Sequence, residues 1–285
     1  MKDLIRSWLY CPGTRPDIIR KALDSPADAV VVDLEDSVPA TAKDAARANV
    51  VEALTWPRSK PLWVRMNALE SHWGIADAQA LLSSRPDGVR VPKCSDPEQV
   101  KRVADLVDSP LSLLIETAAG VQSAYHLAIA DPRVVGISLG EADLQADLRT
   151  RHEVALDWAR QRLVIAARAA ALPSPSQSVY TAIRDDDGLR STTLAGRDLG
   201  FFGRSIIHPA QASIVNEIFT PDPAEVTAAR TVLEHMSSAA ANGGAVAVDE
   251  AGRFIDPAVA EQAAWLVDVS NAIDARQTRT RKTDD

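Results

Sequence analysis

The chain has 285 residues, of which 46% are hydrophobic and 25% charged, and its formal net charge is -8. These values are typical of a globular protein with a substantial core, and the acidic balance argues against nucleic acid and anionic membranes as partners. Two cysteines, Cys11 and Cys94, and the lack of an apolar run of about 18 residues favour a cytoplasmic protein without disulfides or a membrane span.

Short apolar segments alternate with longer amphipathic ones up to residue 210. Strands are expected at 7–12, 29–35, 61–67, 88–93, 111–117, 134–140 and 203–209, with a weaker candidate at 178–183. Helix-like segments follow them, at the roughly 30-residue spacing of a βαβ unit. This alternation predicts a parallel sheet, and about eight units indicate a TIM (β/α)8 barrel over residues 1–220. A doubly wound open sheet is the alternative.

Prolines and aspartates mark where helices begin. Pro16 opens the segment DIIRKAL, and Asp96-Pro97 supplies a cap and a first-turn proline to the next clear example. The longest helical pattern spans 156–172 and is expected to cover the barrel wall.

The chain changes character after His208. Two helical segments, a turn-rich hairpin or loop at 242–256 and a final helix predict a C-terminal helical extension, with a lid segment, over 221–275. The polar end, 276–285, is expected to be disordered.

Acidic side chains gather where the expected strands end. Residues 30–38 read VVVDLEDSV, so a buried strand runs into Asp33, Glu35 and Asp36. Glu116 follows the fifth strand and Asp143 follows the sixth. Taken singly, such residues have structural explanations, such as a helix cap or a turn. In a barrel, however, the C-terminal ends of all strands meet at one mouth, where the chemistry takes place.

Five acids at one mouth need a compensating positive charge. Mg²⁺ prefers oxygen ligands and uses one or two carboxylates together with waters and substrate oxygens. Glu116 and Asp143 are one strand-helix step apart, so we expect them to be direct ligands. Glu35 and Asp36 would bind metal-bound waters or orient neighbouring basic groups. The sequence has no Cys/His cluster, which disfavours zinc.

Arg65 follows the third expected strand and adds a fixed positive charge. It could simply neutralise Asp33. A guanidinium beside a metal can also hold a carbonyl oxygen that becomes an enolate. A metal and an arginine together suit aldol-type cleavage and formation of carbon–carbon bonds.

Several long motifs cover about the first 220 residues. They are RSWLYCPGTRPDIIRKAL, ADAVVVDLEDSVPATAKDAAR, WVRMN, RVPK, IETAAGV, SLGEADLQADL, DDDGL and LGFFGRSIIHPAQASIVNEIFTP. With these motifs in this order, the sequence resembles the citrate lyase β-subunit-like group of the HpcH/HpaI aldolase superfamily.

The resemblance implies a TIM barrel and a Mg²⁺-dependent lyase. It also implies reversible cleavage of a 3-hydroxyacyl-CoA, such as malyl-CoA or citramalyl-CoA, into an acyl-CoA and a 2-oxoacid. By motif, Glu116 and Asp143 match the family's metal ligands, and Arg65 matches the arginine that steadies the thioester enolate. Asn67, in the same WVRMN motif, is expected to contact substrate.

Three further residues take roles from the resemblance. Arg15 and Lys21 match basic residues that contact CoA phosphates, although they could equally belong to a solvated helix face. Asp256 matches an acid/base that a C-terminal segment supplies to a neighbouring subunit, which implies trimers or hexamers; on spacing alone it is a helix cap before Pro257. His208 is expected to close the last strand.

Three departures from the family pattern place the substrate in question more than the reaction class. Arg149 stands where glycine is usual, residues 174–178 replace an Ala-Ile-Asp type sequence, and Arg204 stands where lysine is common. The alternatives are therefore a 2-oxoacid aldolase acting on free hydroxyacids, a malyl-CoA thioesterase, or the β-subunit of a citrate lyase complex whose substrate is carried by an acyl-carrier protein.

Overall fold

The structure is a computed structural model that describes residues 4–283, with side chains described for residues 4–276. The chain divides into two compact units. One holds Ile5–Ile218, and the other holds the chain from Phe219 onward together with Leu4. Each is described below by itself.

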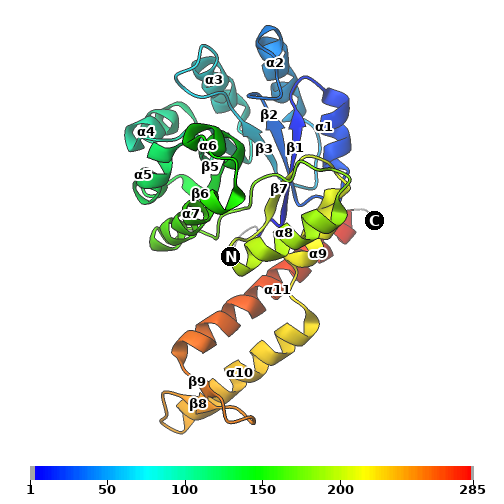
Figure 1. Cartoon of the computed structure of the whole chain (residues 1–285). Helices are drawn as coiled ribbons and strands as arrows, with labels where there is room; N and C mark the ends of the chain where they lie inside the picture. Colours follow the sequence, from blue (N-terminus) through cyan, green and yellow to red (C-terminus); the bar gives the residue numbers. More distant parts are fainter. Residues whose placement is uncertain (1–3, 284–285) are drawn as a thin grey trace. The chain divides into compact units, whose positions relative to one another are not determined.

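The larger unit is built on a curled sheet of seven parallel strands (Figure 1). The strands are β1 (Ser7–Pro12), β2 (Ala29–Asp33), β3 (Leu62–Arg65), β4 (Gly88–Val91), β5 (Leu111–Ile115), β6 (Val134–Leu139) and β7 (Arg204–Ile206). Their order in the sheet is β6-β5-β4-β3-β2-β1-β7. Neighbours in the sheet are thus also neighbours in sequence except where β7 meets β1. This order contradicts a doubly wound sheet, in which the strand order reverses at a switch point.

Helices cover the outer face of this sheet (Figure 1). They are α1 (Pro16–Leu23), α2 (Lys43–Ala53), α3 (Gly74–Ser84), α4 (Pro97–Leu106), α5 (Ala118–Ala128), α6 (Glu141–Leu148), α7 (Asp157–Ala169), α8 (Asp186–Asp198) and α9 (Gln211–Ile218), with short 3₁₀ turns η1 (Ala40–Ala42) and η2 (Glu153–Leu156). Asp96 caps α4 as expected, because its side chain accepts a hydrogen bond from the Glu98 N–H. All five residues of β2 are buried, as expected for a strand packed on both faces.

The expected strand at 178–183 does not form. Only Gln177 pairs with β7, where it forms a bridge to Arg204. On the opposite side, the Ser178 hydroxyl donates to the Leu139 carbonyl of β6. The α/β class and the parallel sheet are therefore confirmed, whereas a closed eight-stranded barrel is not.

The smaller unit is a helical hairpin. Helices α10 (Pro223–Ala241) and α11 (Pro257–Thr283) pack along one another around Ala229, Ala263 and Val267. A short antiparallel pair, β8 (Ala247–Val248) and β9 (Phe254–Ile255), joins them, in agreement with the hairpin expected there. Residues 276–283, where the sequence predicts a disordered end, continue α11; residues 284–285 lie outside the described residues. None of the described helices combines the length and apolarity needed to cross a membrane.

Candidate active site

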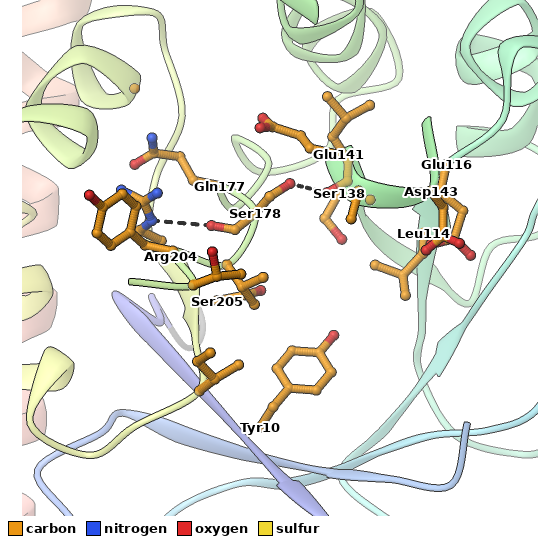
Figure 2. A pocket seen from close by; sticks show the side chains of 18 of the residues that line it. Tyr10, Leu114, Glu116, Ser138, Glu141, Asp143, Gln177, Ser178, Arg204 and Ser205 are labelled. Atoms are coloured by element: carbon orange, nitrogen blue, oxygen red, sulfur yellow. Dashed lines mark hydrogen bonds between the residues drawn. The ribbon is translucent and has the colours of Figure 1, made fainter. Parts of the chain in front are cut away.

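A cavity of about 760 Å³ opens at the carboxyl ends of the strands (Figure 2). Its lining combines charged and polar side chains from several strands with part of helix α8. Of the residues singled out in the sequence, Asp33, Asp36, Arg65, Glu116 and Asp143 line it.

Glu116 and Asp143 form the acidic end of the cavity. Glu116 directly follows β5, is 2% exposed, and its Oε1 accepts a 2.7 Å hydrogen bond from the Lys93 N–H. Asp143 lies in the first turn of α6. Burial, followed by the negative charges of Glu35 and Asp143, raises the pKa of Glu116 to about 7. Neither carboxylate forms an ion pair with a side chain in the described part of the chain.

This donor set fits a hard divalent cation. Burial and a second carboxylate raise the pKa of Glu116, which means that negative charge at this point is not fully compensated by the protein. A bound cation would supply the missing compensation. Within residues 4–276, no three His, Cys, Asp or Glu side chains form a group that could hold a metal on their own. Mg²⁺ matches that limit because it takes few protein carboxylates and completes its shell with water and substrate oxygens. Glu116 and Asp143 are the residues that would hold it.

Gly140 leaves the space that Glu116 occupies. It precedes α6, and a Cβ atom at this position would lie 2.6 Å from the Cβ of Glu116. That distance is too short for two carbon atoms, so only glycine allows β6 to pass this close to the end of β5. The close approach brings the first turn of α6, with Asp143, to the Glu116 carboxylate.

Arg65 pairs with the acidic side chains at the end of β2. Its Nε and Nη2 each donate a 2.7 Å hydrogen bond to the Asp33 carboxylate. Burial opposes ionisation of Asp33, but the hydrogen bonds and charge of Arg65 outweigh burial and hold the pKa of Asp33 below its usual value. Nη1 of Arg65 lies 3.0 Å from Asp36 and 3.2 Å from Glu35. The three acids therefore fix the orientation of Arg65 at the cavity.

Two lysines that the sequence analysis did not assign to the site hold these acids in place. Lys93 donates its N–H to Glu116, and its Nζ lies 3.2 Å from Glu35; its backbone φ is +56°. Such a conformation is uncommon outside glycine and is found at functional sites. Lys43 is buried, and its Nζ donates to the carbonyls of Leu34 and Glu35, both at 2.7 Å.

The expectation that Asn67 contacts substrate is not supported by its position. Asn67 is buried and does not line the cavity. Its Oδ1 accepts from Lys43 at 2.6 Å, and its Nδ2 donates to the Leu34 carbonyl and to Asp77. With its amide fully engaged by the protein, Asn67 supports the loop that carries Glu35.

The remaining predicted residues lie outside the cavity lining. Arg15 is exposed and forms a 2.8 Å ion pair with Asp17, and Lys21 is exposed on α1. Asp256 caps α11, where its Oδ1 accepts from the Val259 N–H at 2.9 Å. His208 follows β7, and its Nδ1 accepts from the Ala210 N–H.

The opposite end of the cavity contains residues that sequence spacing did not reveal as a group. It is lined by Glu141, Arg160, Gln177, Tyr180 and Arg204. Arg160 binds Glu141 with two hydrogen bonds, of 2.9 Å and 2.7 Å. No short motif links these positions, although Arg204 stands out in the sequence as a departure from the family pattern.

A model of the HpcH/HpaI aldolase/citrate lyase family matches residues 6–209. The chain belongs to this family. It is 38% identical to a (3S)-malyl-CoA thioesterase of Cereibacter sphaeroides, over 88% of this chain and 89% of that protein. It is 33% identical to the L-malyl-CoA/beta-methylmalyl-CoA lyase of Rhodobacter capsulatus, over 93% and 94%, and 33% identical to the citrate lyase subunit beta of Escherichia coli, over 90% of each.

A solved structure extends this comparison. The protein CitE from Mycobacterium tuberculosis, in complex with magnesium, acetoacetate and coenzyme A, matches with a TM-score of 0.81 at 28% identity, over 95% of this chain and all of that one. The family resemblance seen in the sequence is thereby confirmed. Membership of this aldolase and lyase family also supports the expected enzyme class, a carbon–carbon lyase.

Proposed function

We propose that this protein is a Mg²⁺-dependent carbon–carbon lyase acting on a 3-hydroxyacyl-CoA such as malyl-CoA or citramalyl-CoA. The products are an acyl-CoA and a 2-oxoacid, or the reaction runs in reverse. One observation carries the proposal: Glu116 and Asp143, without a cation partner in the described residues, share a cavity with an arginine that three acids hold in place. A relative named as a malyl-CoA lyase and a magnesium- and CoA-bound structure support it.

The proposed reaction breaks the bond between C2 and C3 of the acyl chain. A base removes the proton of the 3-hydroxyl, that oxygen becomes the carbonyl of the 2-oxoacid, and the electron pair of the broken bond passes to C2 as a thioester enolate. Protonation of C2 then gives the acyl-CoA. When bound, Mg²⁺ supplies Lewis acidity and orients the oxoacid oxygens.

The chain's own residues have distinct roles in this scheme. Arg65, fixed by Asp33, Glu35 and Asp36, stabilises the enolate oxygen with a permanent positive charge. Asp256 of a neighbouring copy moves the proton to and from C2, which makes the active form a homo-oligomer, a trimer or hexamer. Arg15, which precedes α1, and Lys21, in the last turn of α1, are both exposed and bind the phosphates of CoA.

The same proposal includes a closed barrel in the larger unit. Residues 175–178 run beside β7, with the Gln177 N–H donating to Gly203 and the Ser205 N–H donating to Gln177. We infer that this segment takes the place of an eighth strand between β7 and β6 and so completes a barrel. The barrel would comprise residues 1–220, and residues 221–275 the extension that carries Asp256.

Hydrolysis of the thioester is the second candidate. The identity to a malyl-CoA thioesterase, 38%, exceeds the 33% identity to the malyl-CoA lyase. In that reaction water attacks the thioester carbonyl, the C–S bond breaks, and free CoA leaves with the carbon skeleton of the acid intact. The same metal and arginine could stabilise the oxyanion at that carbonyl.

A panel of 3-hydroxyacyl-CoA thioesters, assayed with Mg²⁺, separates the two reactions. Each sample is analysed for a 2-oxoacid, as its phenylhydrazone, and for free thiol. Glyoxylate, pyruvate or oxaloacetate released together with an intact acyl-CoA supports the lyase. Free thiol in step with the hydroxyacid, without a 2-oxoacid, supports the thioesterase. Turnover that is unaffected by EDTA contradicts both.

A further inference from the structure

Arg204 is a buried cation at the cavity end away from Glu116 and Asp143. It is the first residue of β7, is 6% exposed, and lines the cavity together with Tyr180 and the second half of α8. Figure 2 shows it near Gln177 and away from Glu116 and Asp143. The mechanism proposed above assigns it no role.

Neutral groups alone hold the Arg204 guanidinium. Nε donates to the Ser178 carbonyl at 3.1 Å, and Nη1 donates to the hydroxyls of Thr192 and Thr193 at 2.8 Å and 2.7 Å. The guanidinium carbon lies 5.3 Å from the centre of the Tyr180 ring. Nη2 donates to no described residue, and it is not enclosed by protein atoms, so its N–H groups face the cavity. The Nη2 atom of a fixed guanidinium is thus free to bind a ligand.

No carboxylate of the described residues pairs with this charge. The nearby acid Glu141 has both of its oxygens bound by Arg160. Burial lowers the pKa of Arg204 to about 10, so the side chain stays protonated at neutral pH. A buried charge without a counter-ion is costly in a folded protein. A ligand that brings a negative charge to this point would remove that cost.

Two other polar atoms at this cavity lack partners. Ser138 is 3% exposed, lines the cavity, and its hydroxyl forms no hydrogen bond. The buried Oε1 of Gln177 also has no partner, while Nε2 is fixed by the Thr192 carbonyl. Gly196 makes room for this amide, because a Cβ there would overlap it. The Ser138 hydroxyl is therefore free to donate a hydrogen bond to a ligand in the cavity, in addition to the N–H groups of Arg204 Nη2.

We propose that Arg204 forms a carboxylate-binding subsite, which selects oxoacids that carry a second carboxylate. The oxoacid's first carboxylate and carbonyl would bind at the Glu116 and Asp143 end. Only Nη2 is free, so the fixed guanidinium would donate its remaining N–H groups to one end of a carboxylate as charge-assisted hydrogen bonds, whereas a lysine would offer a flexible point charge. The proposal rests on the cavity's role as a 2-oxoacid site. Within the 3-hydroxyacyl-CoA class it favours substrates that release a dicarboxylic 2-oxoacid, such as oxaloacetate, over malyl-CoA and citramalyl-CoA, which release the monocarboxylates glyoxylate and pyruvate.

Calorimetric binding to the full chain with Mg²⁺ tests the subsite without turnover. The probes are two matched pairs, oxaloacetate with 2-oxobutyrate and 2-oxoglutarate with 2-oxovalerate, which differ by a carboxylate in place of a methyl group. In at least one pair we expect the dicarboxylate to bind about 10-fold or more tightly, as for a charge-assisted hydrogen bond. Arg204→Met should remove this preference. Arg190→Met, which changes an exposed arginine of α8 paired with Glu217, should retain it.

Arg204→Lys covers the case in which the methionine variant does not fold, as judged by thermal melting. It keeps the charge and should reduce the preference severalfold while leaving the binding of the monocarboxylates unchanged. Equal affinities within both pairs, no binding of any probe, or a preference that survives in the folded variants would overturn the subsite. Absence of thioester cleavage, with an Arg204-dependent preference still measured, would reject the proposed activity and leave the subsite standing.

Discussion

Asp33 shows how one side chain organises the end of β2. Besides binding Arg65, its two oxygens accept from the N–H groups of Glu35 and Ser37, at 2.9 Å and 3.0 Å. These bonds fold the chain into a turn directly after the strand and place Glu35 and Asp36 beside Arg65. The repulsion expected among three close acids is therefore offset by one shared arginine and by backbone N–H groups.

Glu116 is offset only in part, by the Lys93 N–H and the charge of Arg65, so its burial leaves a pH-dependent cost in the metal-free protein. Its pKa rises from 4.5 to about 7 on folding. The folded state therefore holds the proton more tightly, and stability falls as pH rises from about 4.5 to 7. Glu116→Gln should stabilise the metal-free protein more at pH 8 than at pH 5.5, by about 2 kcal/mol in the free energy of unfolding.

Urea denaturation in EDTA at the two pH values measures this difference. Glu52→Gln, the same change at an exposed position on α2, serves as the control and should show none of it. Mg²⁺ should stabilise the wild type at pH 8 but not the Glu116→Gln variant. A pH-independent effect of the substitution would show that Glu116 is ionised without penalty, and the cation site would lose its main support.

The sequence located the strand-end acids and Arg65 but not their supporting residues. Side chains at strand ends can be anticipated because parallel strands end at one edge of a sheet. Lys43 and Lys93 act through partners 24 and 23 residues away, Asn67 and Glu116. Such pairings depend on how loops close over the sheet, which local patterns do not encode. Asn67, predicted to contact substrate, lies outside the cavity lining, and its motif says nothing about which way its amide faces.

At the scale of elements, the approach of β6 to β5 sets the geometry of the acidic end. Gly140→Ala would place a methyl group against Glu116 and displace its carboxylate. We expect about 10–100-fold weaker Mg²⁺ binding, as when residues that orient metal ligands are changed. Gly136→Ala, in the same strand, meets only the Ser112 hydroxyl at 3.9 Å and should bind Mg²⁺ normally. Calorimetric titration of both variants with Mg²⁺ decides the matter, and equal affinities would remove Glu116 from the metal site.

A second prediction concerns the contact between α2, α3 and the loop after β3. Asp77 is fully buried and accepts from Arg47 at 2.7 Å and from the Asn67 N–H at 2.9 Å. Asp77→Ala leaves these donors unpaired and should cost about 3–5 kcal/mol of stability, as for a broken buried ion pair.

Asp44 provides the matched control because it pairs with the same Arg47, at 2.8 Å, from a side chain that is 90% exposed. Asp44→Ala should change the unfolding midpoint in urea very little, since solvent screens exposed pairs. Comparable losses in the two variants would mean that Asp77 contributes no more than a surface charge. The loop that carries Asn67 would then need another explanation for its position.

The elements themselves followed closely from hydrophobic pattern and caps. Buried valine-rich segments gave the strands, and Asp96-Pro97 marked the start of α4 as observed. The weak candidate at 178–183 failed, because hydroxyl and amide side chains take over part of the pairing there: Ser178 bonds β6 through its side chain. Helix α11 extends past the final helix expected from the sequence, to Thr283.

At the scale of the whole molecule, the C-terminal unit exposes large apolar side chains, which would remain in contact with water in a monomer. Val248, Phe254 and Trp265 are exposed, and the first two belong to the β8–β9 pair that precedes Asp256. Large exposed apolar side chains grouped on one segment are typical of an interface. This supports the proposal that a second copy receives the segment carrying Asp256.

Mixing two inactive variants tests whether active sites are shared between copies. Glu116→Ala and Asp256→Ala should each abolish Mg²⁺-dependent cleavage while remaining folded. If Asp256 acts in a neighbouring copy, mixed oligomers contain sites in which one chain provides Glu116 and the other Asp256. Activity should therefore reappear after the two are unfolded together and refolded, in the same thioester assay.

Glu116→Ala mixed with Asp143→Ala is the control, because both residues line the same cavity of one chain, so no mixed site regains the pair. This mixture should stay inactive. Recovery in the control would mean that the two carboxylates act in different sites. Full activity of Asp256→Ala alone would mean that Asp256 serves only as the cap of α11, through its hydrogen bond from the Val259 N–H. The proton at C2 would then have to come from a residue that lines the cavity.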